Sequence, residues 1–483
     1  MNIRIILKSL GIVLFIEGLC MFPSLLVSVI FRDGDALSFV ISILVTVAAG
    51  FLLYKIPGNN SKFYARDGFA VVALSWIAIS LFGALPYIIS RTIPSFIDAF
   101  FETVSGFTTT GSSILNDIES LPRGILFWRS FTNWMGGMGI LVLTLAVLPS
   151  IGAGTLHIMR AESPGPSTEK LVPKLGQTAK ILYTIYVVMT CIQVILLMIA
   201  GMPLFDSLVH AFASAGTGGF SIRNSSIGAY GNVYIEIIIT VFTVLFGVNF
   251  GLYYRLIKGD AKGLFRDEEL RFYFGTIIAS IALITIDLYR HGLFTLGQSL
   301  RHSSFQVGTI ITTTGFSSTD FNLWPSFSKI ILVILMVFGA CAGSTGGGIK
   351  CMRILMLLKT ARREIAGVIH PRAVHTVKAG NKVIDEDTVK GTLIYFFIYS
   401  AFFAVSVLLV SLNGKDLVTS ATSVIAALSN IGPGLEAVGP MGNFSDFSIL
   451  SKLILCLDMI AGRLEFLPVL ILFSPMAWKK GSM

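Results

Sequence analysis

Long apolar segments recur along the chain, and short polar segments separate them. Ten are long enough for a helix to cross a bilayer core of about 30 Å; they cover residues 9–30, 36–54, 68–90, 124–149, 178–201, 233–256, 274–290, 328–358, 390–412 and 448–474. Four further apolar stretches are too short to span and lie near residues 95–106, 204–215, 298–311 and 416–428. Such stretches fit half-helices that enter and leave a membrane on one side. The pattern predicts an all-α integral membrane protein with about ten transmembrane helices and four re-entrant half-helices.

A short segment rich in glycine and hydroxyl side chains follows each half-length stretch. The segments are Thr108-Thr109-Thr110-Gly111-Ser112, Thr217-Gly218-Gly219-Phe220-Ser221, Thr313-Thr314-Gly315-Phe316-Ser317 and Ser429-Asn430-Ile431-Gly432-Pro433-Gly434. Their glycines Gly111, Gly219, Gly315 and Gly432 lie 108, 96 and 117 residues apart. Repetition on this scale indicates four copies of one unit. Each unit consists of an outer helix, a half-helix, a Gly-rich loop and an inner helix.

These units divide the chain into a hairpin and four repeats. Residues 1–60 are predicted to form an N-terminal transmembrane hairpin that lies outside the pore, because it carries no Gly-rich loop. The pore repeats are expected at residues 61–155, 156–260, 261–365 and 366–483. The basic linker 359–390 is the longest polar stretch, and we expect it to be a docking surface for a cytoplasmic partner.

Composition and charge support a membrane protein and orient it. With 54% hydrophobic and 13% charged residues, the chain is too apolar for a soluble domain of this length. If the N-terminus lies inside, the cytoplasmic segments hold 25 of the 36 Lys and Arg residues. The positive-inside rule then predicts that both termini are cytoplasmic and that the Gly-rich loops lie toward the outer face. These segments account for the net charge of +9, so no nucleic-acid partner is expected.

The sequence offers little support for an enzyme. Its five cysteines show no paired spacing and its six histidines no metal-ligand spacing, which argues against disulfides and a zinc site. It contains neither a nucleophile triad nor a Walker loop. An integral-membrane enzyme would need converging titratable groups, whereas a scaffold subunit would carry no ion flux. We therefore expect no enzymatic activity and no cofactor in this chain.

The Gly-rich loops have the composition of a cation filter. Backbone carbonyls can replace the hydration shell of a cation without a fixed charge that would trap it. Glycine permits dihedral angles that let successive carbonyls point toward one axis. A half-helix whose C-terminus points inward adds partial negative charge near the ion. A simple re-entrant turn would also need glycine, but four loops at one position in four repeats favour a shared filter.

Three motifs carry a family resemblance. They read Ser105-Gly106-Phe107-Thr108-Thr109-Thr110-Gly111, Thr312-Thr313-Thr314-Gly315-Phe316-Ser317-Ser318-Thr319-Asp320 and Ala342-Gly343-Ser344-Thr345-Gly346-Gly347-Gly348-Ile349-Lys350. In these motifs the chain resembles the Trk/Ktr/HKT superfamily of potassium transporters, over essentially its whole length. Its length and N-terminal hairpin make it more similar to the TrkH members than to the shorter KtrB members. The resemblance implies potassium uptake at the cytoplasmic membrane by a homodimer, with one pseudo-fourfold pore per protomer and a cytosolic, TrkA-like nucleotide-binding ring that gates it.

The resemblance also implies a set of ion ligands. They are backbone carbonyls of Thr109, Thr110, Gly111, Thr217, Gly218, Gly219, Thr313, Thr314, Gly315, Asn430, Ile431 and Gly432. Glycine in all four loops is similar to the potassium-selective members. The loops are unequal, however, since copy two has Ala215-Gly216-Thr217 where copy three has Ile311-Thr312-Thr313. We therefore expect potassium and rubidium to pass, with some leak of sodium.

A gate is predicted within the third inner span. Residues 328–358 are interrupted by Ala342, Gly343, Ser344, Thr345, Gly346, Gly347 and Gly348. Each glycine in a helix interior costs up to about 1 kcal/mol relative to Ala, which argues against a continuous helix. An intramembrane loop below the filter is expected to act as the gate, and close helix packing through small residues is the alternative. For Gly136-Gly137, Gly139, Gly247 and Gly251 in the first two inner spans, packing is the favoured interpretation.

Arg463 is predicted to lie well inside the fourth inner span, where a charge needs a partner or a wet cavity. It could hydrogen-bond the carbonyls of the 342–348 loop and hold the gate closed, or place positive charge below the filter. A local pair with Asp458 or Glu465 is the alternative. Four acidic residues near the outer mouth either concentrate cations or form solvated surface; they are Asp98, Glu102, Asp206 and Asp320.

The expected activity is passage of potassium down its electrochemical gradient through a gated, channel-like pore. The alternative is a symporter that couples potassium to sodium or protons. Secondary transporters of that kind often contain inverted repeats around a midplane site. Because the four repeats here share one orientation, the sequence favours a pore.

Overall fold

The structure, a computed structural model, describes residues 1–56, 64–139, 175–373, 375–379 and 382–478. The regular secondary structure in these ranges is helical, apart from two short antiparallel strands, β1 (Lys378–Ala379) and β2 (Lys382–Val383). The predicted all-helical class is therefore confirmed. The repeat boundaries at 60/61 and 155/156, and the end of the first inner span after residue 139, fall outside the described residues.

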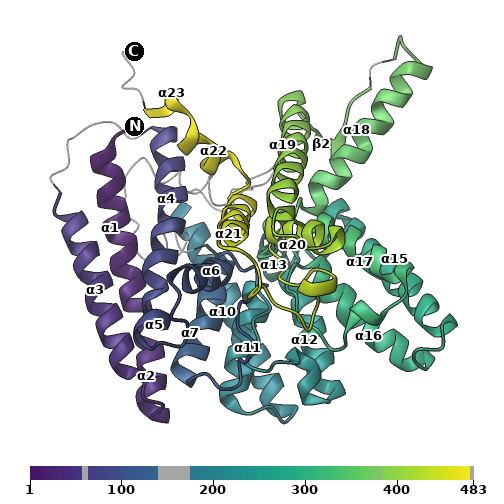
Figure 1. Ribbon diagram of the computed structural model, residues 1–483. Helices are drawn as coiled ribbons and strands as arrows, with labels where there is room; N and C mark the ends of the chain where they lie inside the picture. Colours follow the sequence, from purple (N-terminus) through teal and green to yellow (C-terminus); the bar gives the residue numbers. More distant parts are fainter. Residues whose placement is uncertain (57–63, 140–174, 374, 380–381, 479–483) are drawn as a thin grey trace.

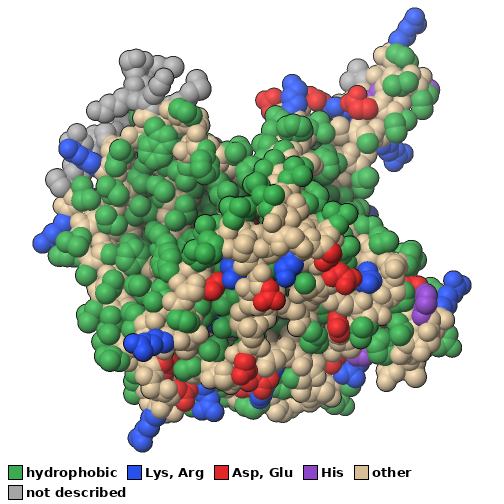
Figure 2. All heavy atoms as spheres, viewed as in Figure 1, with side chains coloured by type: hydrophobic (Ala, Val, Ile, Leu, Met, Phe, Trp, Pro, Cys, Tyr) green, Lys and Arg blue, Asp and Glu red, His purple; other side chains and the backbone are tan. Residues whose placement is uncertain are grey.

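Six continuous apolar spans match the predicted hairpin and the outer helices of the four repeats. The first is formed by α1 (Ile3–Cys20) and α2 (Phe22–Phe31), and the second by α3 (Ala36–Tyr54). The outer helices are α4 (Ala65–Gly83) with α5 (Leu85–Ile89), α10 (Leu175–Ile199), α15 (Glu268–Arg290) and α19 (Glu386–Ser411). Hydrophobic side chains cover the face formed by α1, α3 and α4 (Figure 2). This face is suited to contact with lipid.

The four predicted half-helices are all present. They are α6 (Phe96–Phe107), α11 (Leu204–Gly216), α16 (Leu296–Ile311) and α20 (Leu417–Ser429). Each packs against the first helix of its own inner span, namely α7, α12, α17 or α21. This packing holds the C-terminal ends of the half-helices, and the loops that follow them, within the interior of the molecule (Figure 1).

The inner spans of the second, third and fourth repeats differ from the outer ones because they are interrupted. α7 (Arg123–Gly137) ends two residues before the described segment does, and α12 (Val233–Phe246) meets α13 (Phe250–Ile257) at 92°. A segment covering 339–350 separates α17 (Ser326–Phe338) from α18 (Cys351–Ile369). α21 (Ile449–Arg463) is separated from α22 (Leu467–Phe473) by three residues. The predicted break in the third span is present, and the spans predicted over 233–256 and 448–474 are each divided into two helices.

The breaks in the second and fourth inner spans have different local structures. The amide of Phe250 donates to the carbonyl of Gly343 (3.0 Å), and the Asn249 side chain caps α13. The close packing favoured for Gly247 is present, since a Cβ there would lie 2.5 Å from the Tyr273 hydroxyl, and α12 also ends at the preceding residue. In the fourth span, Glu465 and Phe466 adopt positive φ angles of 54° and 66°, which end α21.

The N-terminal hairpin packs on the outside of the first repeat. α1 contacts α3 and α4, and α2 contacts α7. α1 and α3 approach closely because a Cβ on Gly11 would lie 2.6 Å from the carbonyl oxygen of Gly50. Both termini lie at the same end of the molecule (Figure 1), with the Met1 amino group 3.3 Å from the carbonyl oxygen of Ala477.

Short elements complete the described fold. They are α14 (Ala261–Arg266), α23 (Pro475–Trp478) and the 3₁₀ helices η1 (Ser226–Tyr230), η2 (Phe321–Leu323) and η3 (Glu436–Val438). α18 and the β1–β2 strands project away from the helical body, at the same end as the termini (Figure 1). The predicted basic linker 359–390 thus spans the end of α18, both strands and the first turn of α19.

Candidate functional site

Each half-helix leads into its Gly-rich loop through the same backbone motif. In the first loop, the amide of Thr110 donates to the carbonyl of Ser105 (2.9 Å), and that of Thr109 to Gly106 (3.0 Å). This pattern is a Schellman motif, which usually places glycine at the left-handed position. The equivalent bonds are present in the other three loops: Gly218 to Ala213 and Thr217 to Ser214, Thr314 to Thr309 and Thr313 to Ile310, Ile431 to Ala426 and Asn430 to Ala427.

The left-handed position in each loop is occupied by a residue other than glycine. The φ angles are 55° at Thr109, 56° at Thr217, 59° at Thr313 and 55° at Asn430. This conformation costs an L-residue about 1–2 kcal/mol. The filter glycines also have positive φ angles, 79°, 66°, 84° and 97° in chain order. Each loop therefore repeats one strained backbone conformation, and such strain often occurs at functional sites.

The four loops contact one another in a closed ring. A Cβ on each filter glycine would clash with the middle carbonyl oxygen of the next loop: Gly111 with Gly218 at 2.0 Å, Gly219 with Thr314 at 1.9 Å, Gly315 with Ile431 at 1.9 Å and Gly432 with Thr110 at 2.8 Å. The order of contacts follows the order of the chain and returns to its start. Every predicted ligand residue is therefore brought to a single ring, and only glycine fits at its closest contacts.

The ring is unequal in the way that the sequence predicted. Pairs of threonine hydroxyls brace two of the loops, Thr108 with Thr110 and Thr312 with Thr314, each at 2.8 Å. The second loop has glycine at both equivalent positions. In the fourth loop, the Asn430 amide instead donates to the hydroxyl of Thr110 and to the carbonyl of Met459, both at 2.9 Å. The first and third loops, which lie opposite each other in the ring, are thus the most alike.

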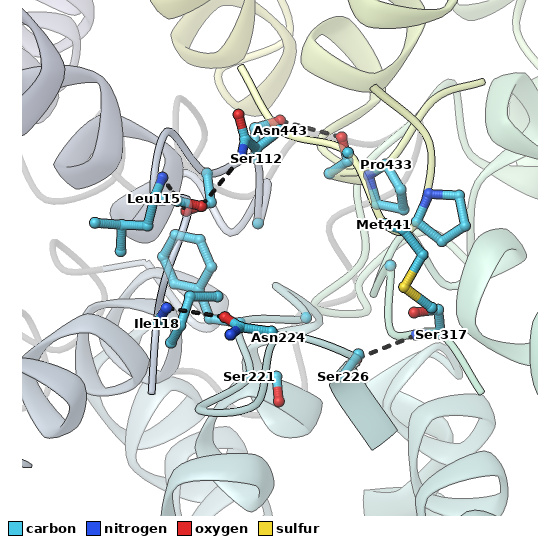
Figure 3. Close-up of a pocket in the computed structure, with 18 of the residues that line it drawn as sticks. Ser112, Leu115, Ile118, Ser221, Asn224, Ser226, Ser317, Pro433, Met441 and Asn443 are labelled. Atoms are coloured by element: carbon cyan, nitrogen blue, oxygen red, sulfur yellow. Dashed lines mark hydrogen bonds between the residues drawn. The ribbon is translucent and has the colours of Figure 1, made fainter. Parts of the chain in front are cut away.

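A cavity of about 150 Å³ lies against one end of the ring (Figure 3). It is lined by all four filter glycines and by Ser112, Ser221 and Ser317 among other residues. Hydrogen bonds between repeats hold its rim: Asn224 accepts from the amide of Ile118 (2.9 Å), and Ser226 from that of Ser317 (3.3 Å). At the exposed edge, hydrogen bonds from Asn224 and Ser120 lower the pKa of Asp117. The lining is therefore polar and includes the cationic side chains of Arg129 and Arg223, and Asp117 beside it stays anionic at neutral pH.

The segment 339–350, which we call the gate loop after the role predicted for it from the sequence, contacts the opposite end of the ring. The amide of Gly347 donates to the hydroxyl of Thr313 (2.6 Å). A Cβ on Gly347 would lie 2.3 Å from the carbonyl oxygen of Ser429, and one on Gly346 would lie 2.9 Å from that of Thr312. The cavity, which we call the outer cavity after its predicted orientation, contacts the glycine that ends each filter loop. The gate loop contacts the residues at the start of the third and fourth loops. All predicted gate residues from Ala342 to Gly348 belong to this loop.

Side chains and carbonyls from other helices hold the gate loop. One carboxylate oxygen of Glu269 accepts from the amides of Ala342 (2.6 Å) and Met352 (3.0 Å), at the two ends of the loop. Phe246 and Gly247 at the end of α12 accept from Thr345 (3.2 Å) and Cys341 (3.0 Å). The buried Lys350 ammonium donates to the carbonyl of Gly346. The loop is therefore anchored along its whole length.

Arg463 joins the gate loop to the first repeat. Its guanidinium donates to the carbonyls of Thr345 (2.8 Å), Gly136 (2.6 Å) and Gly137 (2.8 Å). Glu465, one of the local partners considered for it, instead pairs with Arg353. The other, Asp458, accepts from Ser406 (2.8 Å). The predicted contact between Arg463 and the loop carbonyls is thus present in the structure.

The acidic residues near the outer mouth have specific partners. Asp98 pairs with Lys452 (2.6 Å), and Asp206 accepts from the hydroxyl of Tyr230 (2.6 Å). Asp320 caps η2, and the fully buried Glu102 pairs with Arg129 (2.6 Å). Neither sequence interpretation, cation concentration or solvated surface, fits Glu102.

Sequence reasoning did not single out Glu269, Lys350 or Arg129. Glu269 lies in the first turn of α15, where an acidic residue is expected simply because it interacts favourably with the helix dipole. Lys350 follows the last gate glycine by two positions, and a basic residue so close to these glycines was a usable signal. For Arg129, a basic residue within the predicted apolar span 124–149 was a usable signal that called for a partner.

Comparisons with known proteins agree with this architecture. Residues 36–480 match the TrkH family, described as cation transport proteins. The chain is 38% identical to the Trk system potassium uptake protein TrkH of Escherichia coli, over 99% of this chain and 100% of that protein. It is 34% identical to the TrkG protein of the same organism, with 99% of each covered.

A solved structure is also similar. The crystal structure of the potassium transporter TrkH from Vibrio parahaemolyticus matches with a TM-score of 0.89 and 33% identity, covering 99% of this chain and 100% of that one. These matches establish a multi-pass membrane transport protein rather than an enzyme. The chain belongs to the TrkH family of cation transport proteins.

Proposed function

We propose that this protein takes up potassium across the cytoplasmic membrane through a gated, channel-like pore. The observation that carries the proposal is the closed ring of four loops, each entered from a half-helix by the same Schellman motif. The relatives named above as potassium uptake proteins support potassium as the transported ion. A polar cavity on one side of the ring and the gate loop on the other supply the two ends that a pore requires.

The filter would bind potassium through backbone carbonyls of its four loops. The ligands are those of residues 109–111, 217–219, 313–315 and 430–432. Positive φ angles at the first and third residue of each set support this assignment, because glycine-type backbone conformations let successive carbonyls turn toward one axis. Rubidium should pass as well, since the carbonyls replace the hydration shell of any monovalent cation of suitable size.

The gate loop would control passage from the inner side of the filter. In the described conformation it packs against the third and fourth filter loops and is fixed by Arg463. Opening requires that the loop move away from Thr313 and that the three hydrogen bonds of Arg463 break or rearrange. The guanidinium also places positive charge below the filter, which adds an electrostatic barrier to cations.

A sodium- or proton-coupled potassium symporter is the alternative. The ring of four loops in one chain order favours a pore, because carriers often bind their substrate between inverted repeats. Coupling would require flux that depends on a second ion. The experiment below distinguishes the two.

The cellular setting follows from the same family. The matched relatives are components of the Trk system, which supports a homodimer regulated by a cytosolic, TrkA-like nucleotide-binding ring. The termini lie together, and α18 with β1–β2 projects at the same end (Figure 1). With both termini cytoplasmic, as the charge distribution predicts, this projection would face the regulatory ring.

Ion flux into liposomes that contain only the purified protein tests the proposal. Gradients of potassium, rubidium and sodium are imposed separately, and flux is followed for each ion. We expect potassium and rubidium flux without any second ion. Flux that appears only with a sodium or proton gradient would support the symporter instead. Absence of flux, even in an Arg463→Ala variant, would contradict the proposed filter.

A further inference from the structure

A buried ion pair lies behind the first two filter loops. Glu102 on α6 and Arg129 on α7 meet at 2.6 Å, and their side chains are 0% and 2% exposed. A pair at this depth is held strongly in place, because losing one partner leaves an uncompensated buried charge. Both residues have further contacts that connect the pair to the filter.

The Glu102 carboxylate holds the segment by which the chain leaves the first filter loop. It accepts from the amide of Ile114 (3.0 Å) and from the hydroxyl of Ser113 (3.0 and 3.1 Å). These residues follow Gly111 by two and three positions. The carboxylate thus fixes the outer end of this loop from behind.

The Arg129 guanidinium holds the corresponding segment of the second loop. It donates to the carbonyl of Ser221 (2.8 Å) and lies 3.5 Å from the centre of the Phe220 ring, which is a favourable cation–π contact. Ser221 also lies 3.0 Å from a ring nitrogen of His210. Because Arg129 lines the outer cavity beside Gly111 and Gly219, the pair reaches the outer end of the filter itself.

Neutral contacts occupy the corresponding places behind the third and fourth loops. The residues nine positions before the filter glycines are Glu102, His210, Gln306 and Ser423. Gln306 donates to the carbonyl of Phe316 (3.4 Å), and Thr309 donates to the same atom (3.0 Å). In the fourth repeat, Thr422 accepts from the amide of Leu435 (3.0 Å). A buried ionic connection joins the exit segments of the first two loops, whereas the ion pair between the third and fourth repeats, Lys329 with Glu436 (3.9 Å), is partly exposed.

We propose that Glu102 and Arg129 are positioning residues that determine the selectivity of the filter for potassium over sodium. This inference rests on the proposed function. The pair sets the separation between the exit segments of the first two loops, and hence how far their carbonyls can close around a smaller ion. Carbonyls that can move inward bind the smaller sodium ion better. Carbonyls whose loops are fixed in place by the Glu102–Arg129 pair cannot close around it.

The test measures the potassium-to-sodium permeability ratio in liposomes for Glu102→Gln and Arg129→Lys. Each change keeps approximate size but weakens a charged hydrogen bond, and we expect each to lower the ratio at least about fivefold. Ser113→Ala removes only one hydroxyl contact and should lower the ratio by a smaller factor. It remains informative if the buried variants cannot be purified.

Asp98→Asn is the matched control, because Asp98 lies on the same half-helix and its pair with Lys452 (2.6 Å) joins α6 to α21. Its ratio should equal that of the wild type. A purely structural role would reduce the flux of all ions in proportion and leave the ratio unchanged. Unchanged ratios in all variants, with wild-type flux intact, would overturn the role of the pair alone. Absence of wild-type potassium flux would overturn the proposed function first.

Discussion

The filter loops and the gate loop both place non-helical backbone among buried helices, but they stabilise it differently. Each filter loop is held by amides that donate to carbonyls of the half-helix directly before it, as Thr110 does to Ser105. The gate loop depends on partners distant in the sequence, such as Glu269 and Arg463. Non-helical backbone in a membrane protein must have its polar groups satisfied. At the start of each filter loop the half-helix before it meets this requirement, whereas the gate loop meets it largely through distant partners.

This difference suggests a division of labour. A loop held by its own half-helix forms whenever that helix forms, so the filter should persist while other parts of the protein move. A loop held by separate helices can change position when any of them shifts, because packed elements switch between discrete arrangements. Substitutions in the filter should therefore abolish or alter conduction, whereas substitutions at the anchors of the gate should increase it.

The largest effect is expected at the closest contact in the ring. Gly315→Ala places a methyl group 1.9 Å from the carbonyl oxygen of Ile431 at a φ of 84°. The loops must move apart, and rubidium uptake into liposomes should fall at least about 100-fold, since a displacement of about 1 Å at a functional site can cost that much. Gly432→Ala is the milder control, because its methyl group would lie 2.8 Å from the carbonyl oxygen of Thr110. This variant should lose less activity. Equal losses would argue against the ring geometry.

The next largest effect should come from Arg463→Ala, which removes three hydrogen bonds from a charged donor. Bonds of this kind contribute about 1.5–3 kcal/mol each. Loss of even one such contribution from the closed state would raise potassium flux about tenfold to 100-fold. Arg463→Lys separates the two possible roles, since it keeps the charge but loses the planar fork. Low flux in the Lys variant would indicate a charge barrier, and high flux would indicate a hydrogen-bonded latch.

Glu269→Gln should have a smaller effect in the same direction. An amide oxygen can still accept from Ala342 and Met352, but without the additional strength of a charged acceptor. We expect potassium flux to rise about threefold to tenfold, corresponding to roughly 1 kcal/mol. Glu268→Gln is the control, because its carboxylate pairs with Lys359 (2.6 Å) on α18. A rise of equal size in both variants would show that α18, rather than the loop contact, controls the gate.

The smallest effect is expected where the two regions meet. Thr313→Val removes the hydroxyl that accepts from the amide of Gly347 (2.6 Å) and keeps the branched shape of the side chain. Loss of one neutral hydrogen bond costs about 1 kcal/mol, so flux should rise no more than about fivefold while the preference for potassium over sodium is kept. A changed ion preference would show that this hydroxyl belongs to the filter and not to the gate.

Patterns local in sequence predicted much of the fold. Outer helices and half-helices were recognisable from the length and hydropathy of single segments, and the gate loop from its run of glycines. The 92° bend after α12 was missed because it depends on the bond from Phe250 to Gly343, nearly a hundred residues away. The break at Glu465 and Phe466 lies between Gly462 and Pro468, a local signal that the prediction did not use.

The candidate site was predicted in its residues but not in its connections. The filter glycines and Arg463 could be identified because their residue types are unusual at those depths. That each glycine abuts the next loop, or that Arg129 reaches the carbonyl of Ser221 in the second loop, depends on how the repeats pack together. No pattern within a single repeat contains that information.

The most direct test of the central claim is to locate a transported ion. Crystals of the protein grown in rubidium chloride would allow rubidium to be located by its anomalous scattering. We predict density on the axis of the ring, with carbonyl oxygens from residues 109–111, 217–219, 313–315 and 430–432 as ligands. Rubidium bound elsewhere, or ligands from fewer than four loops, would contradict a single filter built from all four repeats.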